Sequence, residues 1–157
     1  MAIERERKFL VNRPLWETID KGKSSLVRQA YLATDTDKTV RVRVMDDIGF
    51  LCVKGLREGI SRLEFEYTIP LEDAEQMITQ LTKTEITKLR YKVKDGDFTW
   101  EVDEFLGDNT GLIIAEIELD SENQPYDKPA WLGNEVTFDD RYSNSSLVTK
   151  PFKDWSV

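Results

Sequence analysis

The sequence predicts a mainly β fold (α+β) built on one antiparallel sheet of about eight strands. Three observations indicate this fold. Short segments of alternating polar and apolar residues recur along the chain, turn-forming Asp, Gly and Pro residues separate them, and helical periodicity is confined to a few stretches. A sheet of this size tends to curl or close on itself. The length of 157 residues suits one domain, which we expect to span residues 1–157.

Three segments carry helical signals. Residues 14–22 begin with Pro14 and end at Gly22, the positions that these residues favour in helices. Residues 71–82 have an apolar stripe at helical spacing and acidic residues in the first turn. A third short helix is expected over 141–150. The expected strands cover residues 3–11, 26–33, 39–46, 49–55, 60–70, 85–94, 97–105, 112–120 and, as a short ninth strand, 135–139.

The composition excludes several classes of partner. The net charge of −8 argues against a general nucleic-acid-binding protein, which would carry a basic excess. No apolar run approaches the roughly 20 residues of a membrane span, and the N-terminus has no signal-peptide core. Cys52 is the single cysteine, so no intramolecular disulfide can form. We therefore expect a cytoplasmic protein that binds neither nucleic acid nor membrane.

Histidine is absent from the sequence. This excludes Ser-His and Cys-His nucleophile pairs, histidine general bases and histidine-ligated zinc. The remaining chemistry must use carboxylates, Lys, Arg, Tyr, or a hard metal ion bound by oxygen atoms.

Charged residues occupy alternate positions in most of the expected strands. Successive side chains of a strand point to opposite sides of the sheet, so each strand has one ionic face and one apolar face. Most of these ionic faces tend toward one sign of charge. The charged residues that share this alternation are Glu4, Glu6, Lys8, Arg41, Arg43, Lys54, Arg62, Glu64, Glu66, Lys88, Arg90, Lys92, Glu101, Asp103, Glu116 and Glu118.

Two arrangements satisfy this pattern. In an open sheet the ionic face lies in water, whereas in a closed sheet it lines a polar tunnel. A merely solvated face tolerates Thr, Ser, Gln and Asn, and Lys and Glu are poorer strand residues. Segregated acidic and basic stripes therefore favour a binding surface. Carboxylates suit Mg²⁺ or Mn²⁺, and clustered Arg and Lys suit phosphate oxygens, so the pattern indicates a site for a metal–polyphosphate.

The sequence also resembles a known family. Glu4-x-Glu6-x-Lys8 matches the ExExK signature of the CYTH superfamily, the triphosphate tunnel metalloenzymes. The ending EVTFDDRYSNSSL resembles that of the short bacterial members, so the similarity covers essentially the whole chain. The other matches, in order, are Gln29 and Tyr31 in QAYL, Arg41 and Arg43 in RVR, Lys54-Gly55, Glu64 and Glu66 in RLEFE, Lys88 and Arg90 in KLR, Asp103 in WEVDEF, and Glu116 and Glu118 in AEIEL.

The resemblance implies an eight-stranded antiparallel β-barrel that forms a charged tunnel, with a few helices packed outside. Members of this family bind a linear triphosphate, or a compound that carries one, together with Mg²⁺ or Mn²⁺. Their activities include inorganic triphosphatase, thiamine triphosphatase, RNA triphosphatase and class IV adenylate cyclase. We accordingly expect a small-molecule triphosphate substrate and a monomer or homodimer.

The resemblance also implies roles for individual residues. Glu4, Glu116 and Glu118 would hold one metal ion, and Glu6 would help hold a second ion or orient the attacking water. The implied metal ligands are Glu4, Glu6, Asp103, Glu116 and Glu118. The implied substrate-binding residues are Lys8, Arg41, Arg43, Lys54, Glu64, Glu66, Lys88, Arg90, Arg141 and Lys150. The implied catalytic residues are Glu4, Glu6, Lys8, Tyr31, Lys88 and Asp103.

Metal-dependent hydrolysis of tripolyphosphate to pyrophosphate and phosphate is the function that we expect. The chain is compact and shows no obvious adenine or thiamine pocket. The alternatives are a class IV-type adenylate cyclase or thiamine triphosphatase, and a non-catalytic polyphosphate- or nucleotide-binding protein. Because phosphoryl transfer needs mainly alignment and charge neutralisation, the same charged groups serve hydrolase and cyclase chemistry alike.

Overall fold

The computed structural model describes residues 2–155. Met1, Ser156 and Val157, the ends of the expected domain, lie outside the described residues. Strands dominate the structure, as expected, and short helices connect or follow them. The elements are β1 (Ile3–Val11), α1 (Arg13–Trp16), β2 (Ser24–Thr34), β3 (Lys38–Met45), β4 (Ile48–Gly55), β5 (Ser61–Ile69), α2 (Leu71–Leu81), β6 (Ile86–Asp95), β7 (Phe98–Phe105), η1 (Gly107–Asn109), β8 (Ile113–Glu118), β9 (Leu132–Glu135), η2 (Asp140–Tyr142), α3 (Asn144–Thr149) and η3 (Phe152–Asp154).

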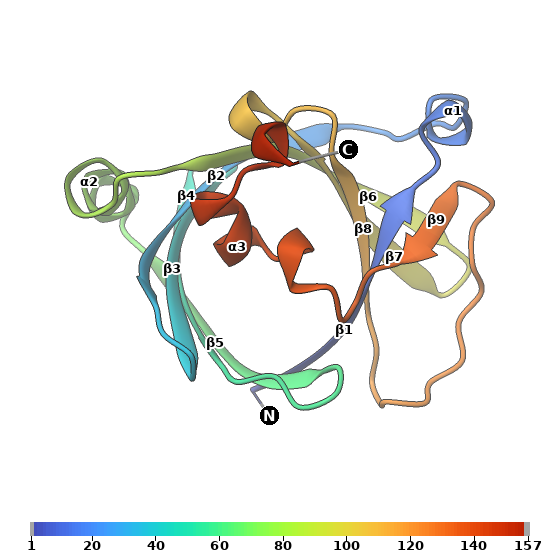
Figure 1. The fold of residues 1–157 in the computed structure, drawn as a ribbon, viewed down its shortest axis with the longest axis horizontal. Coiled ribbons are helices and arrows are strands. Elements are labelled where there is room, and N and C mark those ends of the chain that lie inside the picture. Colours follow the sequence, from blue (N-terminus) through green and yellow to red (C-terminus); the bar gives the residue numbers. More distant parts are fainter. Residues whose placement is uncertain (1, 156–157) are drawn as a thin grey trace.

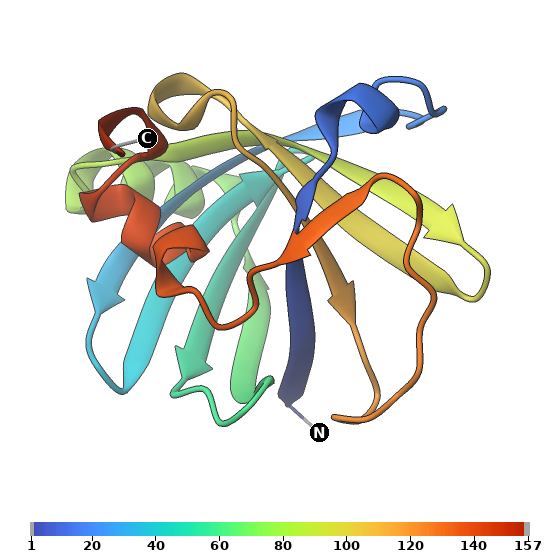
Figure 2. The ribbon, with the colours of Figure 1, turned by 45° about the vertical axis from the view of Figure 1, so that its right-hand side comes forward.

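Eight of the strands close into an antiparallel barrel (Figure 1). The hydrogen-bonded order is β5-β4-β3-β2-β6-β7-β8-β1, and β1 also pairs with β5, with Ile3 opposite Leu63. β9 adds a short strand beside the C-terminal half of β1 (Figure 2). The predicted eight-stranded antiparallel barrel is therefore confirmed. Because the barrel is closed, alternate side chains of every strand point into one enclosed interior.

The β3–β4 hairpin shows how local sequence sets the register of the barrel. Val40, Val42 and Val44 alternate with arginines, a pattern typical of a strand with one apolar face. Asp46 and Asp47 then adopt positive φ angles of 53° and 61°. Such angles at both central residues form the tight turn that suits the twist of a hairpin. The turn keeps the two arginines of β3 on the inner face of the barrel.

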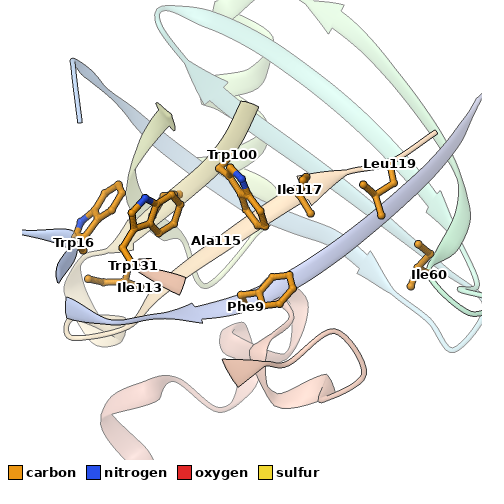
Figure 3. Close-up of a cluster of buried hydrophobic side chains, with 10 residues drawn as sticks. Phe9, Trp16, Ile60, Trp100, Ile113, Ala115, Ile117, Leu119 and Trp131 are labelled. Atoms are coloured by element: carbon orange, nitrogen blue, oxygen red, sulfur yellow. The ribbon is translucent and has the colours of Figure 1, made fainter. Parts of the chain in front are cut away.

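Much of the apolar core lies outside the barrel wall. Trp100, Trp131 and Phe9 belong to one cluster on the outer side of β1, β7 and β8 (Figure 3). The Trp100 ring meets the Trp131 ring edge-on at 5.9 Å and the Phe9 ring at 5.6 Å. Edge-to-face contact is a favoured geometry for aromatic pairs. These tryptophans therefore pack against the exterior of the barrel wall.

Helix α2 covers another part of the exterior. Its buried residues Ala74 and Ile78 pack against β2, β3 and β4, as the predicted stripe required. Gly49 in β4 permits this close approach, because a Cβ atom at that position would lie 2.8 Å from the Cβ of Ala74. None of the helices in residues 2–155 is long and apolar enough to span a membrane.

Helix α3 differs from the expectation that the helices pack outside the barrel. It lies within the ring of strands when the molecule is viewed as in Figure 1. Asn144, at its start, lines the interior, whereas Leu147 is buried against Ile86 and Phe105. Burial of Leu147 at this end of the barrel explains why the helix turns inward. The C-terminal segment thus forms part of the wall of the tunnel.

Two other predicted elements differ in extent. The helix expected over 14–22 is instead Arg13–Trp16. Asn12 caps its start, and the buried Trp16 indole at its end donates a 2.7 Å hydrogen bond to Glu104. The strand expected over 135–139 is instead Leu132–Glu135. Beyond it, the hydroxyl of Thr137 accepts a hydrogen bond from the Lys8 backbone N–H at 3.0 Å. Together with the Val136 backbone N–H, which donates to the Lys8 carbonyl at 2.8 Å, this contact holds the chain beside β1 after β9 ends.

Candidate functional site: a charged tunnel

The barrel encloses a cavity of about 350 Å³ lined mainly by charged side chains. The alternation read from the sequence places these side chains on the inner face. Arg62, Lys92 and Glu101, which also fit the alternation, line the cavity as well. The predicted site residues that the structure brings together here are Glu4, Glu6, Lys8, Tyr31, Arg41, Arg43, Lys54, Glu64, Glu66, Lys88, Arg90, Glu116 and Glu118.

One side of the cavity is acidic. Strands β1 and β8 pair so that Glu6 lies opposite Glu118 and Lys8 opposite Glu116. We call Glu4, Glu6, Glu116 and Glu118 the acidic wall. Side chains on paired strands lie within a few ångströms of one another, so like charges at these positions repel. The barrel register therefore concentrates negative charge that the isolated strands would keep apart.

Pairs of acidic side chains share protons on this side of the cavity. Burial and the neighbouring Glu116 and Glu4 raise the pKa of Glu6 well above its usual value. Burial opposes the ionisation of Glu116, but Lys8 and a hydrogen bond from Glu6 outweigh it and lower the pKa of Glu116 to about 2. Glu6 therefore tends to retain a proton while Glu116 is ionised.

Glu4 and Glu64 form a second unequal pair. Lys54 Nζ lies 2.9 Å from a Glu4 oxygen and 3.4 Å from a Glu64 oxygen. Burial opposes ionisation of Glu4, yet Lys54 and the hydrogen bond with Glu64 lower its pKa to about 2. Burial and the contact with Glu4 raise the pKa of Glu64 to about 7. A positive ion near these oxygens would favour full ionisation of both pairs.

The opposite side of the cavity is basic. We call Arg41, Arg43, Lys88 and Arg90 the basic wall; these residues come from β3 and β6, on either side of β2. Arg90 donates to Asp103 through Nε and Nη2, at 2.8 Å and 2.9 Å, in a two-pronged contact. Lys88 Nζ lies 2.9 Å from the same carboxylate. Burial lowers the pKa of Lys88 to about 7 in spite of Asp103, with Arg90 and Arg43 adding to the shift.

The two arginines of β3 have unused donors. Arg41 is only 7% exposed, and its Nε has no hydrogen-bond partner in the described part of the chain. Its Nη2 lies 3.3 Å from Glu66. Arg43 uses Nε to donate to Gln29 at 3.1 Å, and burial, followed by repulsion from Arg41 and Arg90, lowers its pKa to about 10. A buried donor without a partner is costly, so this wall is suited to an anionic ligand.

Three predicted site residues do not line the cavity. Asp103 is 1% exposed and lies behind Lys88 and Arg90, where it neutralises them. Arg141 is largely exposed and contacts Asp139 at 2.7 Å. Lys150 is exposed at the end of α3. The outward Arg5 and Arg7 make surface contacts instead, as strand alternation predicts.

Several residues on or next to the cavity surface were not assigned a role from the sequence. Gln29 is fully buried and bonds to Arg43, and Asn144 reaches the interior from α3. Gln29 lies two residues before Tyr31 and therefore points to the same side of β2, so strand alternation could have identified it. Nothing in the sequence places Asn144 in the barrel. The remaining uncharged residues on the cavity surface are Thr39, Met45, Phe50, Cys52, Ser143 and Ser145.

The acidic wall has the chemistry of a divalent-metal site. Carboxylate oxygens are the ligands that Mg²⁺ and Mn²⁺ prefer. Burial and the neighbouring Glu116 and Glu4 raise the pKa of Glu6, so a cation bound at this wall would favour the ionised carboxylate. Within residues 2–155, however, no three acidic or cysteine side chains are gathered closely enough to hold a metal ion by themselves. Phosphate oxygens and water would therefore complete the coordination, which is common for Mg²⁺.

Comparison with known proteins relates this geometry to a family. A family model described as the CYTH domain matches residues 2–150. An inorganic triphosphatase of Acetivibrio thermocellus is 53% identical over 156 residues, which cover 99% of both chains. An inorganic triphosphatase of Nitrosomonas europaea is 36% identical over 152 residues, covering 92% of this chain and 96% of its own.

Solved structures show the same architecture. The crystal structure of the inorganic triphosphatase NE1496 is 33% identical, with a TM-score of 0.63 over 91% of this chain and 95% of its own. The structure of a putative adenylate cyclase from Bacillus halodurans has a TM-score of 0.62 at 17% identity, which indicates a shared fold. With a family model that spans residues 2–150 and relatives similar along nearly their whole lengths, the chain belongs to the CYTH family.

Proposed function

We propose that this chain hydrolyses inorganic triphosphate to pyrophosphate and phosphate inside the tunnel, with the help of a divalent cation. The observation that carries the proposal is that the acidic wall and the basic wall line the same cavity. A metal-bound triphosphate has both kinds of surface, because its oxygens need cationic donors and its metal needs carboxylates. The names of two relatives, both inorganic triphosphatases, support this substrate.

The basic wall is proposed to bind the phosphate groups. The unpartnered Nε of Arg41 would gain an acceptor from a phosphate oxygen. Lys8 and Lys54, which also line the cavity, would neutralise further oxygens, together with Arg43, Lys88 and Arg90. Phosphoryl transfer depends mainly on alignment and on stabilisation of charge that spreads over the transferred group. A cavity wall with this many fixed donors meets both requirements.

The acidic wall is proposed to hold Mg²⁺ or Mn²⁺ through Glu4, Glu6, Glu116 and Glu118. When bound, such an ion supplies Lewis-acid stabilisation and lowers the pKa of coordinated water. Glu6 is proposed to lose its retained proton on metal binding and to orient the attacking water. Tyr31 lines the same cavity and offers a hydroxyl for this water or for a phosphate oxygen.

Asp103 is proposed to act behind the substrate-binding side chains. Its two oxygens accept from Lys88 and Arg90, and it does not reach the cavity surface. A buried carboxylate in this position fixes the orientation of both cationic groups. We therefore propose a positioning role in place of the metal-ligand role that the resemblance implied.

Other activities need features that this chain does not display. An adenylate cyclase or thiamine triphosphatase requires a pocket for an organic group beside the triphosphate, and the cavity lining is predominantly charged. A non-catalytic binder would not need the complete acidic wall. A cytoplasmic location is also proposed, because a chain whose single cysteine cannot form an internal disulfide suits a reducing compartment.

A substrate panel tests the proposal. Phosphate release is measured from tripolyphosphate, pyrophosphate, ATP and thiamine triphosphate, each with Mg²⁺, with Mn²⁺ and with a chelator. We expect tripolyphosphate to be the fastest substrate, and turnover to disappear with the chelator. Inertness toward all four compounds would remove the enzymatic proposal.

A matched pair of variants connects the activity to the cavity. Glu4→Gln removes a charge from the acidic wall and should abolish turnover, with a lower but still cooperative thermal unfolding transition, because Lys54 loses its carboxylate partner. Glu72→Gln removes a charge from the exposed first turn of α2 and should keep full activity. Full activity in Glu4→Gln would show that the acidic wall is misassigned.

A further inference from the structure

A chain of hydrogen bonds connects the C-terminal helix to the basic wall. Arg43 Nε donates to Gln29 Oε1 at 3.1 Å, and Gln29 Nε2 donates to Asn144 Oδ1 at 3.1 Å. Lys88 Nζ donates to the same Asn144 oxygen at 3.0 Å and contacts Asp103 at 2.9 Å. The five residues come from β3, β2, α3, β6 and β7. One network thus joins four strands of the barrel to the segment that enters it.

The chemistry of the two ends fixes the orientation of both amides. Arg43 and Lys88 can only donate hydrogen bonds, so each must face an amide oxygen. Gln29 therefore turns its oxygen toward Arg43 and its NH₂ toward Asn144. Asn144 must then present its oxygen to Gln29 and Lys88 together. A carboxylate at position 29 could accept from Arg43 but could not donate to Asn144, so the link requires an amide there.

The residues of this network are shielded from water. Gln29 is 0% exposed and Lys88 is 1% exposed, so water has little access to replace a lost partner. A buried polar group that loses its partner is costly, which favours the single arrangement in which every donor is paired. Gln29 and Asn144 carry no charge and contribute nothing to the phosphate-binding field by themselves. Their distinctive property is that they restrict the positions of charged neighbours.

Lys88 has three N–H donors, and two of them are already used. One contacts Asp103 and one contacts Asn144, which leaves a single N–H for a ligand in the cavity that Lys88 lines. Arg43 uses Nε for Gln29, which leaves the N–H groups of its two Nη atoms. The network therefore reduces the rotational freedom of each cation before a phosphate arrives.

Asn144 is itself held by the packing of α3. Ser143 caps the helix, with its hydroxyl accepting from the Ser146 backbone N–H at 3.2 Å. Leu147, one turn later, is buried against Ile86 and Phe105 at the edge of the barrel. These contacts place the Asn144 side chain at a defined depth in the cavity. Hydrogen bonds thereby connect the C-terminal segment directly to β6 and, through Gln29, to β3.

We propose that Asn144 and Gln29 are positioning residues, which hold Lys88 and Arg43 in the orientation that binds the transferring triphosphate. This inference rests on the proposed function, because it assigns the network a purpose in triphosphate binding. The C-terminal helix is then a component of the active site, and its asparagine sets the geometry of the basic wall. Loss of the network leaves every charged group present but less well aligned.

Steady-state kinetics with tripolyphosphate and Mg²⁺ test this proposal. Asn144→Ala should lower kcat/KM about tenfold, through a higher KM as well as a lower kcat, because misaligned donors weaken contacts with the bound substrate and with the transition state. Asn144→Asp keeps an oxygen for both donors and should stay within about threefold of the unmodified protein. Thr149→Ala, an exposed position in the same helix, is the matched control and should leave activity and thermal stability unchanged.

A second variant tests whether the two amides act as a unit. Gln29→Ala should lower kcat/KM by a similar factor, and the double variant Gln29→Ala/Asn144→Ala should be little worse than either single one. An unaffected kcat/KM in Asn144→Ala, equal losses in Asn144→Ala and Asn144→Asp, or effects that multiply in the double variant would overturn the proposal.

Calorimetric binding of tripolyphosphate in the presence of a chelator separates this inference from the proposed hydrolysis. Asn144→Ala should weaken metal-free binding about fivefold or more, and Thr149→Ala should not. An unmodified protein that releases no phosphate from any compound would end the hydrolysis proposal, and the binding series would still decide the role of Asn144. Equal affinity in Asn144→Ala and the unmodified protein would overturn that role.

Discussion

The basic wall and the acidic wall face the same cavity, but their side chains have different partners. Lys88 and Arg90 are held by Asp103, and the structure pairs Lys88 further with Asn144. Burial raises the pKa of Glu6 well above its usual value, and the neighbouring carboxylates Glu116 and Glu4 add to the shift. The protein therefore orders Lys88 and Arg90 by itself, whereas Glu6 in the opposite wall has no cation at ion-pair distance among the described residues.

This difference has a physical reason. A cation can be fixed in advance by a buried carboxylate and still keep N–H groups for a ligand, as the guanidinium of Arg90 does. A carboxylate that ligates metal must leave its oxygens free, so neighbouring carboxylates repel until the ion is present. We infer that binding energy from the metal–triphosphate orders the acidic wall, and that the basic wall needs little further ordering.

The largest expected effect comes from removing one carboxylate of the acidic wall. Glu6→Gln should lower phosphate release from tripolyphosphate about 10³-fold, because a loss of metal-ion stabilisation costs several kcal/mol in the transition state. Its metal-free thermal stability should be unchanged or higher, since Gln resembles the protonated Glu6 that burial already favours. Activity assays check the predicted loss of rate, and thermal unfolding checks the predicted stability. A strongly destabilised Glu6→Gln would contradict the contrast between the walls.

Removing the carboxylate behind the basic wall should lower stability as well as activity. Asp103→Asn should destabilise the protein by about 3–5 kcal/mol, because Lys88 and Arg90 lose the carboxylate that compensates their buried charge. Activity should fall about 100-fold, since both donors lose their alignment. Urea unfolding and kinetics measure these effects, with Asp97→Asn in the exposed β6–β7 turn as control. Full stability in Asp103→Asn would show that the basic wall is not organised by this residue.

A smaller effect is expected in the pH dependence of metal-free stability. Glu64 has a pKa of about 7 in the folded protein, so above pH 4.5 the unfolded chain releases its proton while the folded protein retains it. This group should make stability fall as pH rises from about 4.5 to about 7. The urea midpoint should therefore fall less between pH 5 and pH 7 in Glu64→Gln. An identical fall in both proteins would disprove this contribution.

At acidic pH, stability should depend on Glu4 and Glu116, the member of each unequal glutamate pair whose pKa the fold lowers. Glu4 and Glu116 have pKa values of about 2, so the stability that they contribute is complete above pH 4.5 and disappears as pH falls toward 2. We expect Glu116→Gln to lessen the loss of stability between pH 4.5 and pH 2.5, measured by urea unfolding. The same slope in both proteins would show that Glu116 is not held ionised in the fold.

The smallest effects should come from charges on the outer side of β1. Arg5 donates to the backbone oxygen of Asp120 at 3.0 Å, and Arg7 contacts Glu135 at 2.8 Å, both on the exterior. Arg5→Gln and Arg7→Gln should change kcat/KM less than about twofold and stability by less than about 1 kcal/mol. Steady-state rates and thermal unfolding suffice to check both. A large loss of activity in either would mean that the inward and outward faces of β1 are misassigned.

Strand alternation made much of the tunnel predictable. Because Glu4, Glu6 and Lys8 alternate with Arg5 and Arg7, the two sets had to lie on opposite faces once β1 was recognised as a strand. The same parity assigned the inward residues of β3, β6 and β8. The resemblance to a known family then indicated closure of the sheet, which alternation alone left open.

Strand alternation could not predict which inward-pointing residues reach the cavity surface. Glu101 and Asp103 have the same parity on β7, yet Glu101 lines the cavity and Asp103 lies behind two cations. Their difference arises from three-dimensional pairing with β6, where Arg90 lies opposite Asp103. Entry of α3 into the barrel likewise depends on where Leu147 finds a buried site. Such tertiary contacts have no local sequence signal.

A crystal structure with Mn²⁺ and a slowly hydrolysed tripolyphosphate analogue is the most direct test of the two walls. We predict an anomalous manganese peak among Glu4, Glu6, Glu116 and Glu118, with phosphate density against Arg41, Arg43, Lys88 and Arg90. The basic side chains should keep their present contacts, and the acidic ones should reorient toward the ion. Manganese and phosphate bound on the outer surface, with the cavity filled by water, would contradict the assignment of metal binding to the acidic wall and phosphate binding to the basic wall.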